Sequence, residues 1–203
     1  TISSFIIFVF SLYIHGTISI NKNQYFLETF KENKIYTKII SPNFELKYNS
    51  SIEDIENKLQ KLIRYSDPDP KKETIFVWPE GIFTGYSFDE ILKFNQLIQN
   101  NFSKNHYILF GINTLEPNSG EYFNSLIVVN NNFKILYKYN KKKLVPFGEF
   151  LPMERYLQKI GLKKITHGYK SFSKGEQRNV INIKNKFYDF KLLPLICYEI
   201  IYS

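Results

Sequence analysis

The fold is decided by a short apolar stretch, TIFVWPEG, which occupies residues 74–81. Residues 74–78 form a continuous apolar run, which is typical of a β-strand covered on both faces. Before it, Ser50 and Glu53 make a capping box that begins a helix. Behind this box, apolar residues recur at helical spacing, at Ile52, Ile55, Leu59, Leu62 and Ile63. A helix followed by a buried strand predicts an α/β fold.

The same alternation continues on both sides of this stretch. Residues 34–40 are rich in β-branched and aromatic residues and predict an earlier strand. A second capping box, at Ser87 and Glu90, predicts another helix, and residues 107–112 predict another buried strand. The apolar stripe of that second helix consists of Ile91, Phe94, Leu97 and Ile98.

Two hairpins are predicted in the second half of the chain. Residues 123–129 and 133–139 flank Asn130 to Asn132, and asparagine tolerates the left-handed conformations that a hairpin turn needs. Residues 179–183 and 187–193 flank a second polar turn. Crossover and hairpin connections together predict one α/β layered sandwich, in which helices cover the sheets from outside.

Composition supports a globular domain and excludes several other classes. The chain has 203 residues, of which 43% are hydrophobic and 23% charged. Its single cysteine excludes a disulfide-stapled scaffold and a zinc site built on several thiolates. The net charge of +8 is spread over lysines scattered among acidic residues, which is not the pattern of a nucleic-acid site. We therefore expect no nucleic-acid partner.

The first twenty residues differ from the rest. They are apolar without periodicity, and no acid, lysine or arginine precedes Lys22. We predict that residues 1–20 are the end of a transmembrane helix, although Ser, His, Gly and Thr interrupt the run. A buried strand or core helix is the alternative.

Three chemically reactive side chains follow three apolar segments. Glu80 follows the strand at residues 74–78, and Lys141 follows the strand that ends at Tyr139. Cys197 comes just after an apolar strand at residues 192–196, where a helix is expected to begin. Strand ends are where α/β folds build their sites. A desolvated carboxylate can act as a base, a fixed ammonium can hold an oxyanion, and a thiol at a helix start is a nucleophile.

The sequence segments around these residues resemble those of a known family. The segments that carry the resemblance are VWPEG, YNKKKLVPFGEFLP and LLPLICYEIIY, and the segments YFNSLIVVN and GEQRNV support it. The sequence resembles the carbon-nitrogen hydrolase (nitrilase) superfamily, whose Glu-Lys-Cys triad lies on an α-β-β-α sandwich. Within it, the sequence is most similar to the family of bacterial apolipoprotein N-acyltransferases, which are inner-membrane enzymes whose nitrilase-like domain faces the periplasm.

The resemblance implies a role for each matching residue. Glu80 is expected to be the general base, Lys141 the oxyanion-stabilising cation and Cys197 the nucleophile. Lys141 is preferred over Lys142 and Lys143 because it stands eight residues before Glu149, as in the family pattern. The expected supporting residues are Glu149 and Glu199. The expected substrate-binding residues are Trp78, Phe147 and Tyr198, while Phe83, Tyr86 and Phe150 are aromatics that line either an acyl pocket or the core.

The implied reaction is acyl transfer through a thioester on the cysteine, with no metal and no cofactor. The expected donor is a membrane phospholipid, and the acceptor is the lipid-modified N-terminal cysteine of an apolipoprotein. The family's domain continues beyond its cysteine. We therefore expect the nitrilase-like domain at residues 34–203 to be incomplete, and hypothesise that this chain alone is inactive or unstable.

Two other functions fit parts of the sequence. A soluble nitrilase-type amidase keeps the triad but acts on small amides. A basic module that binds a membrane surface or nucleic acid uses the charge of +8 and needs no triad.

Overall fold

The computed structural model describes residues 2–29, 35–45, 50–153, 156, 159, 171–184, 186 and 188–202. The chain divides into two compact units, residues 1–35 and residues 36–203.

The first unit is a single long helix, α1 (Ile2–Thr29). It continues past residue 20, where the sequence pattern placed its end. Residues 3–25 are long and apolar enough to cross a membrane by length and composition. Most side chains described in this helix are exposed, including those of Phe5, Phe8 and Ile18. The transmembrane reading of this helix therefore stays a prediction, and within its own unit the helix presents its apolar side chains outward.

The second unit is built on a five-stranded sheet whose strands lie in sequence order. The strands are β1 (Tyr36–Ile39), β2 (Thr74–Val77), β3 (His106–Leu115), β4 (Tyr122–Val129) and β5 (Ile135–Asn140). β1, β2 and β3 pair in parallel, whereas β3, β4 and β5 pair antiparallel. Because two reversals restore the direction, β5 runs the same way as β2. Residues that follow these two strands therefore emerge at one edge of the sheet.

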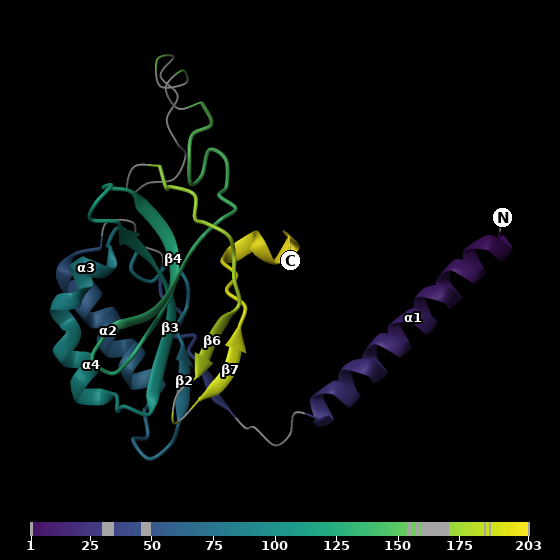
Figure 1. Cartoon of the computed structure of the whole chain (residues 1–203), viewed down its shortest axis with the longest axis horizontal. Helices are drawn as coiled ribbons and strands as arrows, with labels where there is room; N and C mark the ends of the chain where they lie inside the picture. Colours follow the sequence, from purple (N-terminus) through teal and green to yellow (C-terminus); the bar gives the residue numbers. More distant parts are fainter. Residues whose placement is uncertain are drawn as a thin grey trace. The chain divides into compact units, whose positions relative to one another are not determined.

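Helices cover one face of this sheet (Figure 1). They are α2 (Ile52–Ser66), α3 (Phe88–Ile91), the 3₁₀ turn η1 (Leu92–Phe94) and α4 (Asn95–Asn101). The stripe of α2 is buried from Ile55 onward, whereas Ile52, in the first turn, is exposed. The second predicted helix is thus divided by η1, although Ile91 and Ile98 are both fully buried as the stripe requires.

Of the two predicted capping boxes, one is confirmed and one is not. The predicted box at Ser50 and Glu53 is wrong by one residue. The observed cap of α2 is Ser51, whose backbone N–H donates to the Asp54 carboxylate at 2.8 Å while its hydroxyl accepts from the Asp54 N–H at 3.1 Å. At α3, Glu90 accepts from both the N–H and the hydroxyl of Ser87, at 2.7 and 2.8 Å, as predicted.

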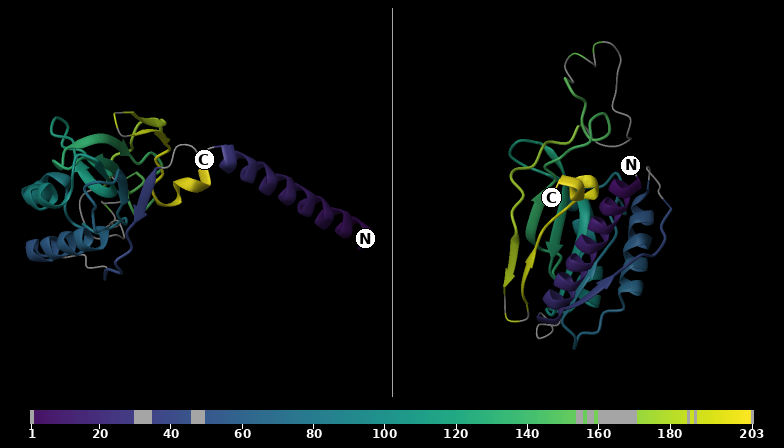
Figure 2. Two further views of the ribbon diagram at one scale, coloured as in Figure 1. Left: turned by 90° about the horizontal axis from the view of Figure 1, so that it is seen from below. Right: turned by 90° about the vertical axis from the view of Figure 1, so that its right-hand side faces the viewer.

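A second, two-stranded sheet lies on the other face of the first sheet (Figures 1 and 2). It is the hairpin of β6 (Ile181–Lys184) and β7 (Asp189–Leu192). A core of Ile75, Leu109, Val128, Ile183 and Tyr188 fills the space between the two sheets. The strand predicted for residues 192–196 is wrong, since β7 ends at Leu192. Of the expected α-β-β-α sandwich, the described residues of this unit form three layers: the helices, the five-stranded sheet and the two-stranded sheet.

The turn between β4 and β5 is stabilised in an unexpected way. Its left-handed residue is Phe133, with φ of 55°, and not one of the three asparagines. Phe133 is fully buried and its ring stacks on Phe110. The side chain of Asn130 accepts hydrogen bonds from the N–H groups of Asn132 and Lys134, at 3.0 Å each. Burial of the ring and these bonds compensate for the unfavourable backbone conformation.

Candidate active site

Glu80 and Lys141 lie at the same edge of the five-stranded sheet. The Trp78 N–H donates to the Leu109 carbonyl at 2.8 Å, so pairing of the second strand with β3 continues one residue past β2. The chain then turns at residues 80–85, and Gly81 has φ of 74°, which glycine adopts without strain. Lys141 directly follows β5. The parallel course of β2 and β5 therefore brings the two segments together, as the sequence predicts.

Glu80 lies against the glycine of the neighbouring strand. A Cβ atom on Gly111 of β3 would come 3.4 Å from Cγ of Glu80, which is van der Waals contact distance and shows that the Glu80 stem packs on β3. Partial burial raises the pKa of the Glu80 carboxyl, the charge of Lys141 counteracts part of that rise, and the charge of Glu149 adds to it. The net direction is upward, although the residue remains exposed to solvent. A carboxylate of raised pKa suits a general base.

Lys141 is buried, with 2% of its side chain exposed. Its Nζ atom lies 3.0 Å from both Oε1 and Oε2 of Glu149. The Glu149 carboxylate is held in turn by the Asn124 side-chain amide at 2.8 Å and the Val145 N–H at 2.9 Å. An ammonium has three N–H donors, so this ion pair leaves donor capacity for a substrate oxygen.

The backbone of Lys141 is fixed on both sides. Its N–H donates to the Asn124 carbonyl at 2.8 Å, and its own carbonyl accepts from the Gly175 N–H at 2.9 Å. A Cβ atom on Gly175 would stand 2.0 Å from the Asn140 carbonyl oxygen, which is far inside contact distance. Only glycine permits this close approach, so the segment at residues 171–180 supports the lysine from outside.

Cys197 begins the 3₁₀ helix η3 (Cys197–Tyr202). The helix expected at this position is present, but as a 3₁₀ helix. Cys197 is exposed and its φ is 55°, a left-handed conformation that non-glycine residues seldom adopt. Such strained positions cluster at functional sites. The neighbouring Tyr198 ring has its centroid 5.0 Å from Nζ of Lys141, which brings the cysteine turn to the lysine.

Glu199 ties the cysteine turn to the lysine loop. It is 1% exposed, and its Oε1 accepts from the N–H groups of Lys142 and Lys143 at 3.0 Å each and from the Tyr139 hydroxyl at 2.9 Å. Its Oε2 accepts from the Ile196 N–H at 3.0 Å. One buried carboxylate therefore joins the end of β5 to the residues beside Cys197.

The hydrogen bonds of Glu199 also set its charge. Burial by itself would raise the pKa of Glu199, but bonds from the N–H groups of Lys143 and Ile196, the Tyr139 hydroxyl and the Lys142 N–H outweigh burial and lower it. Burial and the bond to Glu199 raise the pKa of Tyr139 to about 12. Glu199 thus stays ionised and Tyr139 stays a donor at neutral pH.

The predicted substrate-binding aromatics are divided between core and surface. Trp78 is buried, donates its indole N–H to the Ser66 hydroxyl at 3.0 Å and packs on Phe110. Its side chain has no face available to a ligand, so we correct its assignment to the core. Phe83 is also buried against Phe110. The Tyr86 hydroxyl donates to the Ser50 carbonyl at 2.8 Å, which is a structural role.

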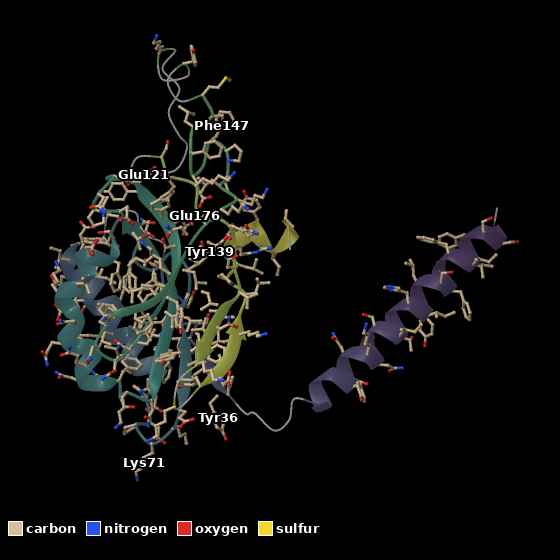
Figure 3. The ribbon with its side chains drawn as sticks, in the orientation of Figure 1. Tyr36, Lys71, Glu121, Tyr139, Phe147 and Glu176 are labelled. Carbon is tan, nitrogen blue, oxygen red and sulfur yellow. The ribbon has the colours of Figure 1, made fainter. Side chains whose placement is uncertain are left out.

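Phe147 is exposed and Phe150 is half-buried. Phe147 is 45% exposed and has φ of 62°. Phe150 lines a pocket next to the lysine loop. Figure 3 shows Phe147, Tyr139 and Glu176 toward one end of the second unit, and Lys71 and Tyr36 toward the opposite end.

Three residues that support the site could not be predicted from the sequence: Asn124, Tyr139 and Gly175. Asn124 and Gly175 lie within phrases that resemble the family, YFNSLIVVN and GEQRNV, but nothing in the sequence connects them to Glu149 or Asn140. Their partners are far away along the chain, and only the pairing of β4 with β5 and the return of residues 171–180 bring them together. Among the described residues, no three His, Cys, Asp or Glu side chains form a metal-binding group.

Comparison with known proteins identifies the class. The family model for carbon-nitrogen hydrolases matches residues 46–203, and the chain belongs to this family. The chain is also similar to a solved carbon-nitrogen hydrolase from Helicobacter pylori, with 18% identity and a TM-score of 0.46 over 76% of this chain and 49% of that one.

Two curated relatives are more specific. The apolipoprotein N-acyltransferase of Wigglesworthia glossinidia brevipalpis is 30% identical over 98% of this chain and 38% of that protein. That of Rhodopseudomonas palustris is 29% identical over 84% of this chain and 33% of that protein. The chain therefore spans 33–38% of the length of these relatives.

Proposed function

We propose that this chain carries the catalytic triad of an apolipoprotein N-acyltransferase, with Glu80 as general base, Lys141 as oxyanion-stabilising cation and Cys197 as nucleophile. The observation that carries the proposal is the buried ion pair of Lys141 with Glu149, at the edge that Glu80 also occupies and to which Glu199 ties the Cys197 turn. The similarity to enzymes named apolipoprotein N-acyltransferase supports the choice of acceptor.

In the first half-reaction, the carboxylate of Glu80 takes the proton of the Cys197 thiol. The sulfur attacks the ester carbonyl of a phospholipid, and the negative charge that develops on the carbonyl oxygen is met by the Lys141 ammonium. When the tetrahedral intermediate collapses, the carbon–oxygen bond of the ester breaks. Glu80 returns its proton to the departing alkoxide, leaving a lysophospholipid and an acyl thioester on Cys197.

In the second half-reaction, the α-amino group of the lipid-modified N-terminal cysteine attacks the thioester carbonyl. Glu80 accepts the proton of the amine, and Lys141 again stabilises the oxyanion. Collapse breaks the carbon–sulfur bond, forms the amide and releases the Cys197 thiolate, which recovers the proton from Glu80. Glu149 and Glu199 act by holding the lysine and the cysteine turn in place.

The membrane location is part of the same proposal. The apolar side chains of α1 are exposed between residues 3 and 25, which suits a lipid environment and not water. Its polar interruptions do not prevent insertion, because the Ser11 and Thr17 hydroxyls donate to the carbonyls of Ile7 and Tyr13 at 2.8 and 2.9 Å. We place α1 in the inner membrane and the catalytic unit on the periplasmic side.

The test is formation of an acyl-enzyme. The detergent-solubilised chain is incubated with a phospholipid, or with short aliphatic amides, and Cys197 is examined by intact-protein mass spectrometry. We expect a mass increase of one acyl chain with phospholipid, and none in the Cys197→Ala variant. Labelling by amides alone would favour an amidase. No labelling by either would overturn the proposed function for this chain and would support instead the hypothesis that it is inactive by itself.

The second half-reaction needs its own assay. The labelled chain is separated from phospholipid and given a synthetic peptide with an N-terminal diacylglyceryl-cysteine. Transfer of the label to the peptide amine is expected. Release of free fatty acid without peptide labelling would contradict the transferase assignment, because water would then be the acceptor.

A further inference from the structure

The proposed general base, Glu80, lies on a turn and not within a strand or helix. It begins the turn at residues 80–85, which connects β2 to the start of α3. Within this turn, the Thr84 hydroxyl donates to the Gly81 carbonyl at 2.6 Å. A general base must stay within hydrogen-bond reach of the proton that it removes. The position of the Glu80 carboxylate therefore depends on the contacts that hold residues 80–85 in place.

Lys58, in the middle of α2, reaches this turn. Its Nζ atom donates to the Ile82 carbonyl at 3.0 Å and to the Ser50 hydroxyl at 2.9 Å. Ile82 is only 4% exposed and packs in the same core cluster as Ile55 and Leu59 of α2. A backbone carbonyl in such surroundings needs a donor, and a bond from an ammonium is stronger than one from a neutral group. Lys58 therefore joins the turn to the helix.

A second hydrogen bond ties the end of the turn to the same place. The Tyr86 hydroxyl donates to the Ser50 carbonyl at 2.8 Å. Ser50 thus accepts one bond from Tyr86 and one from Lys58, just before α2 begins. The helix itself is fixed by its buried stripe, which includes Leu59 and Leu62. Both bonds therefore connect the turn to an element that the core holds firmly.

A small cavity lies beside the turn. Its volume is about 150 Å³, and Lys58, Glu80 and Ile82 are among the residues that line it. Atoms next to a cavity lack packing partners on that side, so packing alone does not prevent a shift of the turn in this direction. The charges that shift the pKa of the Glu80 carboxyl are those of Lys141 and Glu149. The effect of Lys58 on Glu80 therefore comes through the backbone of the turn.

We propose that Lys58 is a positioning residue for the general base: its bond to the Ile82 carbonyl holds the turn where the Glu80 carboxylate reaches the Cys197 thiol. The inference rests on the proposed function, because it needs Glu80 to accept the proton of Cys197. Without the ammonium, the Ile82 carbonyl loses this donor and the turn can shift toward the cavity. A misplacement of about 1 Å is enough to slow a reaction by up to about 100-fold.

Alkylation of Cys197 by iodoacetamide tests the role of Lys58 without any lipid. This cysteine is the only one in the chain, so intact-protein mass spectrometry of the detergent-solubilised chain measures its rate of alkylation. The sulfur displaces iodide, and the thiol proton passes to Glu80. At pH 7 we expect Glu80→Gln to react about 100-fold more slowly than the parent chain, and Lys58→Met about tenfold more slowly.

Two further variants show whether the lysine acts through the glutamate. The double variant Lys58→Met/Glu80→Gln should react no more slowly than Glu80→Gln, because moving a side chain that is no longer a base costs nothing further. Lys58→Arg keeps a cationic donor at the same position and should recover most of the lost rate. At pH 9.5 the parent chain and Lys58→Met should react at equal rates, because thiols ionise without help from a base at such alkaline pH.

Lys61→Met is the matched control. Lys61 is half-buried on the same helix, and its Nζ atom lies 4.9 Å from the centroid of the Phe44 ring. The substitution removes the same charge and should leave the alkylation rate at the parent value. Urea unfolding of each variant checks that the chain is folded at pH 7. Where Lys58→Met is unfolded, Lys58→Gln is compared with Lys61→Gln in its place.

The outcomes separate this inference from the proposed function. Alkylation of Glu80→Gln at the parent rate would mean that Glu80 is not the base, and would overturn the proposed function together with the role of Lys58. Slow alkylation of Glu80→Gln with a parent rate for Lys58→Met would overturn the role of Lys58 alone. The same holds if Lys61→Met is as slow as Lys58→Met, or if the double variant is slower than Glu80→Gln, because the lysine would then act through charge or through the fold.

Discussion

Lys141 and Cys197 occupy the same proposed site but are held in opposite ways. Lys141 is buried, ion-paired, and fixed through its N–H and its carbonyl. Cys197 is exposed and sits in a strained left-handed conformation at the start of a short 3₁₀ helix. A buried charge must be balanced by its surroundings, so the lysine is part of the architecture. An exposed thiol contributes little to packing, so Cys197 is needed for the reaction and not for the fold. The two residues should therefore respond differently to substitution.

The largest expected effect is on chemistry at the cysteine. Cys197→Ala should abolish acyl-enzyme formation, a loss of about 10⁴-fold or more in rate, because no other group can form the thioester. Its stability should change by only about 0.5 kcal/mol, as for other exposed positions. Mass spectrometry and urea unfolding measure the two effects. A large loss of stability would show that Cys197 also supports the fold.

Substitution of Lys141 should cost stability as well as activity. Lys141→Ala leaves the Glu149 carboxylate partly buried without its cation, and should lower the free energy of unfolding by about 3–5 kcal/mol as well as abolish activity. Urea unfolding of the detergent-solubilised chain measures this cost. The double variant Lys141→Met/Glu149→Gln, which removes both charges but keeps an acceptor oxygen for the neighbouring N–H donors, should recover most of the stability but no activity. If the double variant is as unstable as the single one, the ion pair is not the cause.

The tie between the two regions can be weakened at Glu199. Glu199→Gln replaces two acceptor oxygens by one and places an NH₂ group opposite N–H donors, at a cost of about 1.5–3 kcal/mol. Because the pKa of Glu199 is lowered in the folded chain, its stabilising effect is present above the ordinary glutamate pKa and is lost as pH falls through the lowered value. The gap between parent and variant in unfolding free energy should therefore shrink in acid. Glu176→Gln, at an exposed position, is the control.

The smallest expected effect on stability is that of Glu80→Gln. Unlike Glu199→Gln, this substitution should not lower the free energy of unfolding at high pH. Because the pKa of Glu80 is raised in the folded chain, folding favours the protonated form, and this stabilisation is lost as pH rises through the raised value. Glu80→Gln should then be at least as stable as the parent at pH 8, with the difference shrinking in acid. Thermal unfolding at both pH values checks this. Lower stability at pH 8 would contradict it.

Activity gives a second measurement on Glu80. A general base must be deprotonated, so acylation of Cys197 by the parent chain should rise with pH through the raised pKa of Glu80. Glu80→Gln should abolish acylation at every pH. A pH profile that is flat between pH 4 and 8 would mean that another group controls the proton.

Some of the fold could be predicted because its signals are local. The strand at β2, the cap at Ser87 and the buried stripe of α2 depend on neighbouring residues, so periodicity and turn residues reveal them. Two predictions were wrong because neighbouring residues compete for the same structural role. Ser51 with Asp54 caps α2 one residue beyond the predicted box. In the turn between β4 and β5, Phe133 takes the left-handed conformation because this buries its ring. The residue types in the turn favour an asparagine there and do not indicate this burial.

The sequence by itself determined which chemistry this chain can present: a carboxylate, an ammonium and a thiol in phrases that resemble one family. It also determined the alternation of helices and strands, because both follow from short-range spacing. Only the tertiary structure decided that Glu149 holds Lys141, that Glu199 joins the lysine loop to the cysteine turn, and that Trp78 belongs to the core. These contacts join residues distant along the chain, and their geometry depends on strand order and register, which no local pattern specifies.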